Sequence, residues 1–524
     1  MQVHHFLENA AQHDPDKEAV WHKNRWMTYA EIEALSNKVA HYLKERDIRR
    51  GDRVAILYEN AFDYVIAYFA ALKTGAVEVS LNTETTVETL TYALQDSGAK
   101  AIISGKKHLR YLIPALRKAT DVREVIVEQK DVSAYEQIGH CHPVCLGELY
   151  ETGDARSAGT RGIDVDLASI TYTTGSTSRP KGVMLSHLNI VSNTRSIVEY
   201  LALTDRDRIM VVLPFFYVYG KSLLTTHFYV GGSLVIENRS VFPEVVLDTM
   251  KSTEATGFAG VPSTFLILLN RSRVREYTFD RLRYVTQAGG SMAPGIQQKV
   301  AEAFAPARLF IMYGATEAAP RLSYLDPDVL PSKWGSIGKA ISNVELFVAD
   351  EKGRLLPPHC EGEIVARGSN IMAGYWNDPV ETARVLKDGL YYTGDIGTTD
   401  EDGYLYVVGR SKDFIKGGGF RISAKEVEDA LLEIDDVHEA AVIGVDDPIL
   451  GEAIKAFVVQ KDGVELTQEK VSTYLKPLLP AYKQPKYIEL VPSIPKGKSG
   501  KTLKTELRKR ENVHREVTDG QRSD

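Results

Sequence analysis

The sequence is poor in cysteine, has no excess of positive charge and contains no long apolar run. Three cysteines in 524 residues cannot build a disulfide framework. The net charge of −7 argues against a general nucleic-acid binder. No apolar run approaches the roughly 20 residues that cross a bilayer, and the start of the chain lacks the basic and apolar regions of a secretory signal. We therefore expect a cytoplasmic protein with no membrane span and no nucleic-acid partner.

The remaining composition is that of an ordinary globular protein of more than one domain. Hydrophobic residues make up 44% of the chain and charged residues 25%. The first 290 or so residues alternate apolar helical patterns, as at 29–45 and 61–74, with short apolar runs, as at 54–58 and 233–236. Such alternation predicts parallel sheets that are covered by helices.

The pattern changes after residue 339. Residues 344–348, 362–366 and 405–408 alternate with Gly-rich and Pro-rich turns, which predicts a small antiparallel barrel or sheet. Beyond residue 409, two helical and several strand patterns indicate a compact α+β unit of about 100 residues. We therefore expect a large domain over 1–410, a small domain over 411–510 and a polar tail over 511–524.

A loop rich in hydroxyl groups and glycine spans residues 172–182. Glycine lets a backbone approach a ligand closely, serine and threonine donate hydrogen bonds, and lysine adds positive charge. The part from Thr173 to Lys181 therefore suits a polyphosphate, although it lacks the Gly-x4-Gly-Lys-Ser/Thr order of a Walker A loop. Apolar runs on both sides predict that the loop joins two strands, and a plain polar hairpin turn is the alternative interpretation.

Two carboxylates and a glycine-rich turn add to this picture. Glu317 follows an apolar strand pattern and stands beside Thr316, a setting that suits Mg²⁺ bound together with substrate phosphates. Asp395 ends the sequence Tyr-Thr-Gly-Asp, and a carboxylate can accept both hydroxyl groups of a ribose. Residues 287–290, Gln-Ala-Gly-Gly, follow a strand pattern and fit a backbone wall against adenine. A solvated surface acid, a turn aspartate and a tight turn are the structural alternatives.

Several motifs follow the hydroxyl-rich loop in a fixed order. They are Tyr313–Glu317, Gly335–Gly338 ahead of Glu361–Glu363, Tyr392–Asp395, Gly409–Asp413, Gly417–Arg421 and Ser499–Lys501. Together with the loop they resemble the adenylate-forming superfamily of acyl-CoA synthetases, firefly luciferases and peptide-synthetase adenylation domains. The resemblance covers about Thr28 to Arg508. It implies an α/β fold with a large N-terminal domain of two helix-covered mixed sheets, a small barrel-like subdomain and a small mobile α+β C-terminal domain.

The resemblance also implies roles for individual residues. Thr316 would contact the α-phosphate, Glu317 would hold Mg²⁺, and Lys501 would bridge the acid and the α-phosphate. Lys412 would be the hinge about which the small domain swings between two half-reactions. Ser178 departs from the family's usual glycine, and Arg421 is often glutamine in relatives. The remaining nucleotide contacts would be Thr173, Thr174, Gly175, Ser176, Thr177, Lys181, Gln287, Ala288, Gly289, Tyr313, Gly314, Asp395, Arg410, Lys416 and Arg421.

The acid pocket is expected around residues 213–221 and 258–265. Tyr217 replaces the histidine usual in the family, and the segment has no aspartate for a substrate amine, which disfavours amino acids. Aromatic residues provide an apolar wall with a polar tip, so an apolar fatty or aryl acid is expected, although ordinary core packing also explains such residues. The expected pocket residues are Tyr217, Tyr219, Gly220, Gly260 and Val261.

The expected function is therefore ATP-dependent and Mg²⁺-dependent activation of a carboxylic acid, followed by transfer to coenzyme A. An alternative is transfer to the phosphopantetheine arm of a separate acyl carrier protein. A third alternative, an inactive nucleotide-binding scaffold, is disfavoured because Glu317, Asp395 and Lys501 occur together.

A cluster of histidine and cysteine at His140–Cys145 also offers four possible metal ligands. Zinc ligands usually come as two separated pairs, and no second pair lies at finger spacing. We expect a plain surface loop there.

Overall fold

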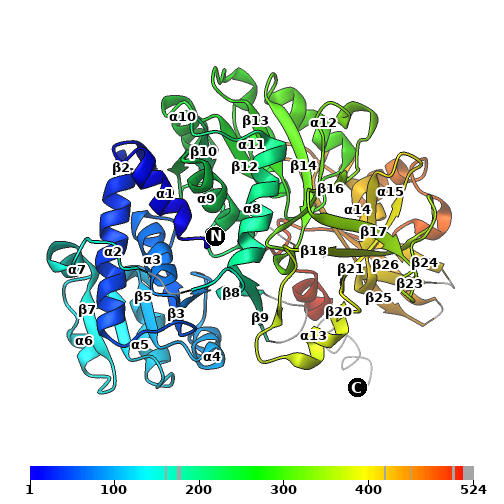
Figure 1. The fold of residues 1–524 in the computed structure, drawn as a ribbon. Helices are drawn as coiled ribbons and strands as arrows, with labels where there is room; N and C mark the ends of the chain where they lie inside the picture. Colours follow the sequence, from blue (N-terminus) through cyan, green and yellow to red (C-terminus); the bar gives the residue numbers. More distant parts are fainter. Residues whose placement is uncertain (160–161, 174–178, 418–419, 449, 498–501, 512–524) are drawn as a thin grey trace.

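Two large sheets form most of the molecule (Figure 1). The computed structural model describes residues 1–159, 162–173, 179–417, 420–448, 450–497 and 502–511. The first sheet runs, in spatial order, β16 (Lys339–Ala340), β15 (Arg321–Leu325), β14 (Arg308–Gly314), β13 (Tyr284–Gln287), β12 (Gly257–Gly260), β10 (Arg208–Val211), β11 (Ser233–Ile236), β1 (Glu18–His22) and β2 (Arg25–Thr28). The second runs β19 (Gly374–Tyr375), β9 (Lys181–Ser186), β8 (Leu167–Thr173), β4 (Val77–Ser80), β3 (Arg53–Leu57), β5 (Ala101–Ser104), β6 (Glu124–Val127) and β7 (His142–Cys145).

Helices cover these sheets, as the sequence predicts. The helices of the large sheets are α1 (His5–His13), α2 (Tyr29–Glu45), α3 (Phe62–Lys73), α4 (Val87–Ser97), α5 (Leu109–Leu116), α6 (Ser133–Glu136), α7 (Leu146–Thr152), α8 (His187–Leu201), α9 (Val218–Val230), α10 (Pro243–Ser252), α11 (Pro262–Arg271) and α12 (Pro294–Ala303). Most neighbouring strands in both sheets pair parallel, whereas β8 and β9 pair antiparallel on either side of the hydroxyl-rich loop. The predictions of helix-covered mixed sheets and of a strand–loop–strand at this loop are confirmed.

The small antiparallel sheet predicted after residue 339 is present. It consists of β17 (Val344–Ala349), β18 (Gly362–Gly368), β21 (Leu390–Thr399) and β20 (Leu386–Lys387), with β22 (Leu405–Arg410) paired to β21 and α13 (Pro379–Val385) alongside. Because β21 pairs with β22, this sheet holds Asp395 directly opposite Arg410.

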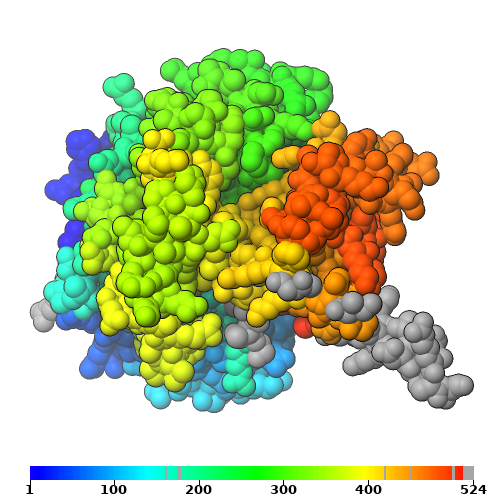
Figure 2. All heavy atoms as spheres, turned by 90° about the vertical axis from the view of Figure 1, so that its right-hand side faces the viewer, coloured from blue at the N-terminus to red at the C-terminus, as the bar shows by residue number. Residues whose placement is uncertain are grey.

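The C-terminal unit has its own sheet and its own apolar core. The sheet contains β24 (Phe420–Ser423), β23 (Phe414–Gly417), β26 (Gly451–Gln460), β25 (Val437–Asp447) and β27 (Tyr487–Leu490), packed with α14 (Ala424–Leu432) and α15 (Gln468–Leu475). Figure 2 shows this unit, in orange and red, lying against the yellow and green parts of the larger unit. Polar pairs join the two, including Asn270 with His438 at 3.1 Å and Lys299 with Asp435 at 3.1 Å.

The expectation of a plain surface loop at His140–Cys145 is wrong. Residues 142–145 form β7, the edge strand of the second sheet, and Cys141 and Cys145 are both buried. Within the described ranges, the group that could hold a metal ion comprises His4, His5 and Glu8 instead. The alternation of polar and apolar residues along one short edge strand therefore explains the histidine and cysteine spacing. In the same ranges, no helix combines the length and apolar composition that crossing a bilayer requires.

A buried ion pair joins the two large sheets. The ammonium of Lys221 on α9 lies 2.6 Å from the carboxylate of Glu78 on β4, and neither side chain is more than 6% exposed. Ser169 donates to the same carboxylate at 2.7 Å, and the Ser80 hydroxyl contacts both charged groups. Hydrogen-bonded partners of this kind are what allow charges to be buried at all. The pair therefore fixes α9 against the second sheet.

Removing one member of this pair is expected to destabilise the fold. Lys221→Met leaves the Glu78 carboxylate buried without its counter-charge, which should cost about 3–5 kcal/mol in the free energy of unfolding. The double variant Lys221→Met/Glu78→Gln should recover part of that loss. Urea unfolding followed by tryptophan fluorescence measures both. Lys299→Met, which removes an exposed pair, is the control, and a single Lys221 variant as stable as the control would contradict the interpretation.

Candidate active site

Tyr313, Asp395 and Arg410 meet at one edge of the first sheet. Tyr313 ends β14, and its hydroxyl donates to Asp395 at 2.7 Å, while the Arg410 guanidinium lies 2.9 Å from the same carboxylate. Asp395 is 6% exposed. Burial and the neighbouring carboxylate both raise the pKa of Tyr313, so its hydroxyl remains a donor. Three sequence-predicted nucleotide residues, from segments up to 97 positions apart in the numbering, are thus brought together.

Glu317 and Lys181 approach the same edge from different strands. Glu317 lies in a short 3-10 helix (Thr316–Ala318) after β14, and the Tyr375 hydroxyl donates to its carboxylate at 2.7 Å. The Lys181 ammonium lies 5.2 Å from the centre of the Tyr375 ring and 2.5 Å from the Glu381 carboxylate of α13. Tyr375 therefore connects the expected metal ligand with the expected phosphate-binding lysine.

Sequence reasoning missed Tyr375 and Glu381. Their signal was weak, because a Gly-Tyr-Trp stretch followed by Asn-Asp-Pro predicts a turn and nothing more specific. Their positions depend on β19 pairing with β9, 190 residues away in the chain, which no local pattern reveals.

The expected adenine wall lies at the end of β13. Gln287 is 1% exposed, and its amide donates to the Gly290 carbonyl at 2.8 Å, which closes a tight turn. Gly289 has φ +85°, and a Cβ there would lie 3.0 Å from Val261. Glycine is therefore required at this turn, and its backbone can pack directly against a flat ligand. The expectations of a tight turn and of a backbone wall are compatible.

The expected acid-pocket residues surround the start of α9. Tyr217 is its N-cap, and a Cβ on Gly220 would lie 2.1 Å from the Pro214 carbonyl oxygen, so only glycine permits this close approach. Gly260 likewise lies against Phe265, at 2.8 Å from a built Cβ. The Tyr219 hydroxyl contacts Thr286 on β13, with 2.9 Å between the two side-chain oxygens.

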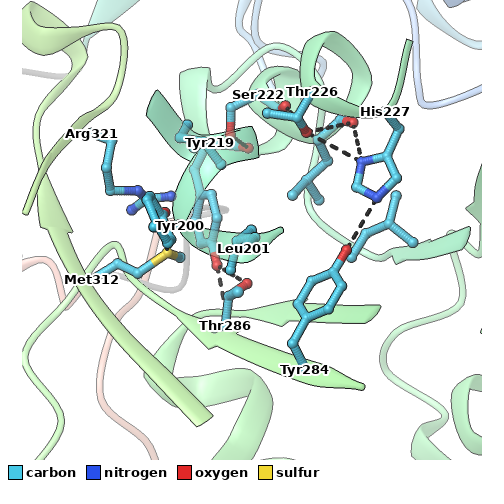
Figure 3. A pocket seen from close by; sticks show the side chains of 13 residues that line it. Tyr200, Leu201, Tyr219, Ser222, Thr226, His227, Tyr284, Thr286, Met312 and Arg321 are labelled. Carbon is cyan, nitrogen blue, oxygen red and sulfur yellow. Dashed lines mark hydrogen bonds between the residues drawn. The ribbon is translucent and has the colours of Figure 1, made fainter. Parts of the chain in front are cut away.

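A small cavity lies beside Tyr219 (Figure 3). It is bounded by α8, α9 and the strands β10, β13, β14 and β15, and its free volume of about 10 Å³ suits roughly one water molecule. Tyr219 belongs to its wall, and so does Arg321, which sequence reasoning also missed. The only signal for Arg321 was a charged residue at the start of an apolar strand pattern.

A larger cleft of about 600 Å³ lies elsewhere, near the ends of β1, β3, β5 and β11. Its lining has four lysine or arginine residues and four carboxylates, so the cleft has no net charge of either sign, and three of these cations form ion pairs. The pairs are Lys106 with Glu128, Lys107 with Glu59, and Arg239 with Glu237.

The structure does not bring every expected residue to the Asp395 edge. Lys416 and Arg421 face each other across β23 and β24, and in the described ranges their contacts are with Glu452 and Phe414 of the same C-terminal unit. Lys412 lies in a short 3-10 helix (Ser411–Asp413) that leads from β22 into that unit. Residues 174–177 and Lys501 lie outside the described residues, so Thr174, Gly175, Ser176, Thr177 and Lys501 remain expectations from the sequence.

The fold and the site define a two-part α/β enzyme built for a nucleoside triphosphate. The chain belongs to the AMP-binding enzymes, whose family model matches residues 7–376, and the C-terminal domain model of the same enzymes matches residues 426–501. It is 34% identical to a feruloyl-CoA synthase of an Amycolatopsis species, over 95% of this chain and 97% of the relative. It is 32% identical to an oxalate–CoA ligase of Arabidopsis thaliana, over 94% of this chain and 96% of the relative.

The fold is likewise that of a solved relative. The crystal structure of ATP-bound MatB from Rhodopseudomonas palustris superposes with a TM-score of 0.85 at 27% identity, covering 97% of this chain and 99% of that one. The protein is therefore an AMP-forming acid–thiol ligase that uses ATP with Mg²⁺ and coenzyme A, and the expectations of fold class, enzyme class and cofactors are confirmed. The two named relatives act on different acids, so overall similarity does not identify the acid.

Loss of the Tyr375 hydroxyl is expected to weaken Mg²⁺ use. Tyr375→Phe removes the donor that orients the Glu317 carboxylate, and such supporting contacts typically contribute about 10–100-fold to metal affinity. The Mg²⁺ concentration giving half-maximal acid-dependent ATP–pyrophosphate exchange should rise by about 10-fold or more. Tyr474→Phe, at a half-exposed position of the C-terminal unit, is the control. An unchanged Mg²⁺ dependence in Tyr375→Phe would contradict this role.

Proposed function

We propose that this enzyme activates a compact carboxylic acid in two half-reactions that use the residues gathered around Asp395. In the first, an oxygen of the acid carboxylate bonds to the α-phosphorus of ATP and the bond to pyrophosphate breaks. In the second, a thiol attacks the acyl carbon, loses its proton, and AMP leaves. The meeting of Tyr313, Asp395 and Arg410 is the observation that carries the proposal. The Asp395 carboxylate offers two oxygen atoms that can accept the ribose hydroxyls, and Tyr313 places an aromatic ring beside it.

The nucleotide roles follow from donor and acceptor chemistry. Asp395 would accept the ribose hydroxyls, with Arg410 and Tyr313 holding its carboxylate in place. The backbone from Gln287 to Gly289 would pack against adenine, with Gly314 close by at the end of β14. Lys181 and the loop residues that follow Thr173 would neutralise the β- and γ-phosphates. Lys501 would bridge the acid and the α-phosphate.

Glu317 fits a Mg²⁺ site at this edge. Its carboxylate is only partly buried and receives the Tyr375 hydroxyl, which leaves acceptor capacity for a hard cation. When bound, Mg²⁺ would neutralise phosphate charge there. Thr316, its neighbour, would donate to the α-phosphate.

A compact acid is favoured over a long acyl chain. Tyr217, Gly260 and Val261 are expected to line its near end, and the space behind Tyr219 closes into a cavity for roughly one water. An aryl or short acid needs less room than a fatty chain. Coenzyme A is the acceptor in this proposal, and an acyl carrier protein acting in trans is the alternative acceptor. A cytoplasmic location is proposed from the sequence as well.

The small domain is proposed to alternate about Lys412, with boundaries near residues 410 and 510. The residues of the first half-reaction occupy the space that the attacking thiol needs, so the two steps require different arrangements. Lys416 and Arg421, now within the C-terminal unit, would approach the nucleotide in one of them.

The first test separates the half-reactions through Lys501. Lys501→Ala is expected to lower acid-dependent ATP–pyrophosphate exchange by about 100-fold or more, since the bridging charge is lost from the transition state. Thioester formation from a supplied acyl adenylate should be largely kept. Lys509→Ala, at an exposed position of the C-terminal unit, is the control. Equal loss of both half-reactions would contradict the proposal, and no exchange with any acid by the wild type would overturn it.

The second test fixes the two units in the arrangement described here. Cysteines replace Lys299 and Asp435, whose side chains are 3.1 Å apart and exposed, in a Cys360→Ser background because Cys360 is the exposed cysteine. A short bifunctional thiol reagent should leave only one half-reaction working, whereas the same variant without reagent should keep both. Two full half-reactions in the cross-linked enzyme would defeat the alternation.

A further inference from the structure

Arg321 differs from the other buried cations of this protein. In the described ranges three lysine or arginine residues are buried, and two of them pair with carboxylates: Lys73 with Glu33 and Lys221 with Glu78. Arg321 is 2% exposed, has no carboxylate within ion-pair distance among the described residues, and its Nε lacks a hydrogen-bond partner. A buried charge without a counter-charge is unfavourable, so a group that supplies one would be bound strongly.

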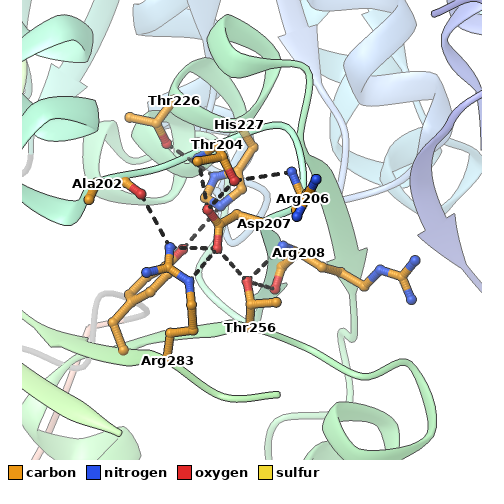
Figure 4. A network of polar contacts seen from close by, with 10 residues as sticks. Ala202, Thr204, Arg206, Asp207, Arg208, Thr226, His227, Thr256 and Arg283 are labelled. Atoms are coloured by element: carbon orange, nitrogen blue, oxygen red, sulfur yellow. Dashed lines mark hydrogen bonds and ion pairs between the residues drawn. The ribbon is translucent and has the colours of Figure 1, made fainter.

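The contrast with Arg283 on the same sheet is clear (Figure 4). Arg283 is about half exposed, and yet its guanidinium makes two contacts to Asp207, at 2.7 and 3.0 Å. Asp207 also accepts from the backbone of Thr204 and the hydroxyl of Thr256. The half-exposed Arg283 therefore has a carboxylate partner, whereas the buried Arg321 has none among the described residues.

The guanidinium of Arg321 faces the small cavity behind Tyr219 (Figure 3). It lies 5.1 Å from the centre of the Tyr219 ring. Burial raises the pKa of Tyr200, and the positive charge of Arg321 partly offsets that rise. His227 also lines the cavity but stays neutral, because burial lowers its pKa to about 4. No carboxylate is among the described lining residues, so the cavity carries one net positive charge.

The cavity borders strands that lead to residues expected at the nucleotide. Arg321 pairs with Gly314 across β14 and β15, and a Cβ on Gly314 would meet the Arg321 Cα at 3.1 Å. Thr286 and Met312 line the cavity, and each directly precedes a residue expected at the nucleotide, Gln287 and Tyr313. An acid whose carboxylate lay at the α-phosphate would therefore have Arg321 near its far end.

We propose that Arg321 selects acids with a second carboxylate, which it binds at the closed end of the acid pocket. The inference rests on the proposed function, because it concerns the same acid. A carboxylate matches the planar donors of a guanidinium. The hydroxyls of Tyr200 and Tyr219, which donate to the Met312 sulfur and to the Thr286 carbonyl, would have to turn to donate to its other lone pairs. Because a carboxylate is larger than the single water for which there is room, its entry requires one of these two rings to move.

The experiment compares matched pairs of acids in ATP–pyrophosphate exchange with the complete enzyme, ATP and Mg²⁺. Each pair shares a skeleton and differs by one carboxylate: straight-chain mono- and dicarboxylic acids of three to ten carbons, and benzoic and cinnamic acids with and without a para-carboxyl group. For at least one skeleton, kcat/KM of the wild type should favour the dicarboxylate by about 100-fold or more, because a site with an unmet charge discriminates strongly.

Two arginine variants show whether the preference belongs to Arg321. Arg321→Met should bring the dicarboxylate down to within about 3-fold of its monocarboxylate partner, a difference that a pocket without a paired charge supports. Arg321→Lys should keep part of the preference. Arg308→Met, an exposed arginine on β14, is the control and should keep all of it.

The outcomes separate the two proposals. Exchange with monocarboxylates at rates equal to or above those of their dicarboxylate partners overturns the role of Arg321 and leaves the proposed function intact. The same holds if Arg321→Met keeps the dicarboxylate preference. Exchange with no acid overturns both. If Arg321→Met does not fold, the wild-type panel together with Arg321→Lys still decides.

Discussion

The buried pair of Lys221 and Glu78 is the constraint on which the acid pocket depends. It lies at the seam between the two large sheets, where α9 of one half meets β4 of the other. Two charges taken from water require near-ideal partners, and the serines at 80 and 169 supply them. With the helix held in this way, Gly220 can approach the Pro214 carbonyl and Tyr219 can reach Thr286. The position of the pocket wall therefore follows from an interaction outside the pocket.

Much of the fold could be predicted from the sequence where the apolar periodicity of a segment agrees with the capping or turn residues at its ends. The helix at 29–45 begins and ends as predicted, because its apolar spacing follows a capping box of Thr28 and Glu31. The strand at 233–236 also agrees. The cluster at His140–Cys145 was interpreted wrongly, since a four-residue edge strand is too short for its alternation to stand out.

The site was predictable only in part, and the limit is physical. Residues inside a sequence motif, such as Tyr313 and Asp395, could be named because the motif itself carries the chemistry. The hydrogen bond from Tyr375 to Glu317 joins residues 58 positions apart, and the bond from Lys181 to Glu381 joins residues 200 positions apart. No local stretch of sequence contains both partners. Arg321 is harder still, because its significance lies in a missing partner. A charged residue on a strand is ordinary in sequence and becomes unusual only when its surroundings are known.

The strengths of the contacts explain how one chain can serve two half-reactions. Inside the large unit, the buried ammonium groups of Lys73 and Lys221 pair with carboxylates, so their surroundings change little without a large loss of stability. Between the units, the Lys299 and Asp435 side chains are 41% and 87% exposed, and exposed pairs of this kind contribute about 0–1 kcal/mol. Leu432 adds a partly buried apolar contact. In the proposed alternation, an interface of this kind would separate and reform at low cost, whereas the expected nucleotide site and acid pocket would stay in place. The division between a rigid large unit and a weakly attached small one is therefore present in the energetics of the side chains.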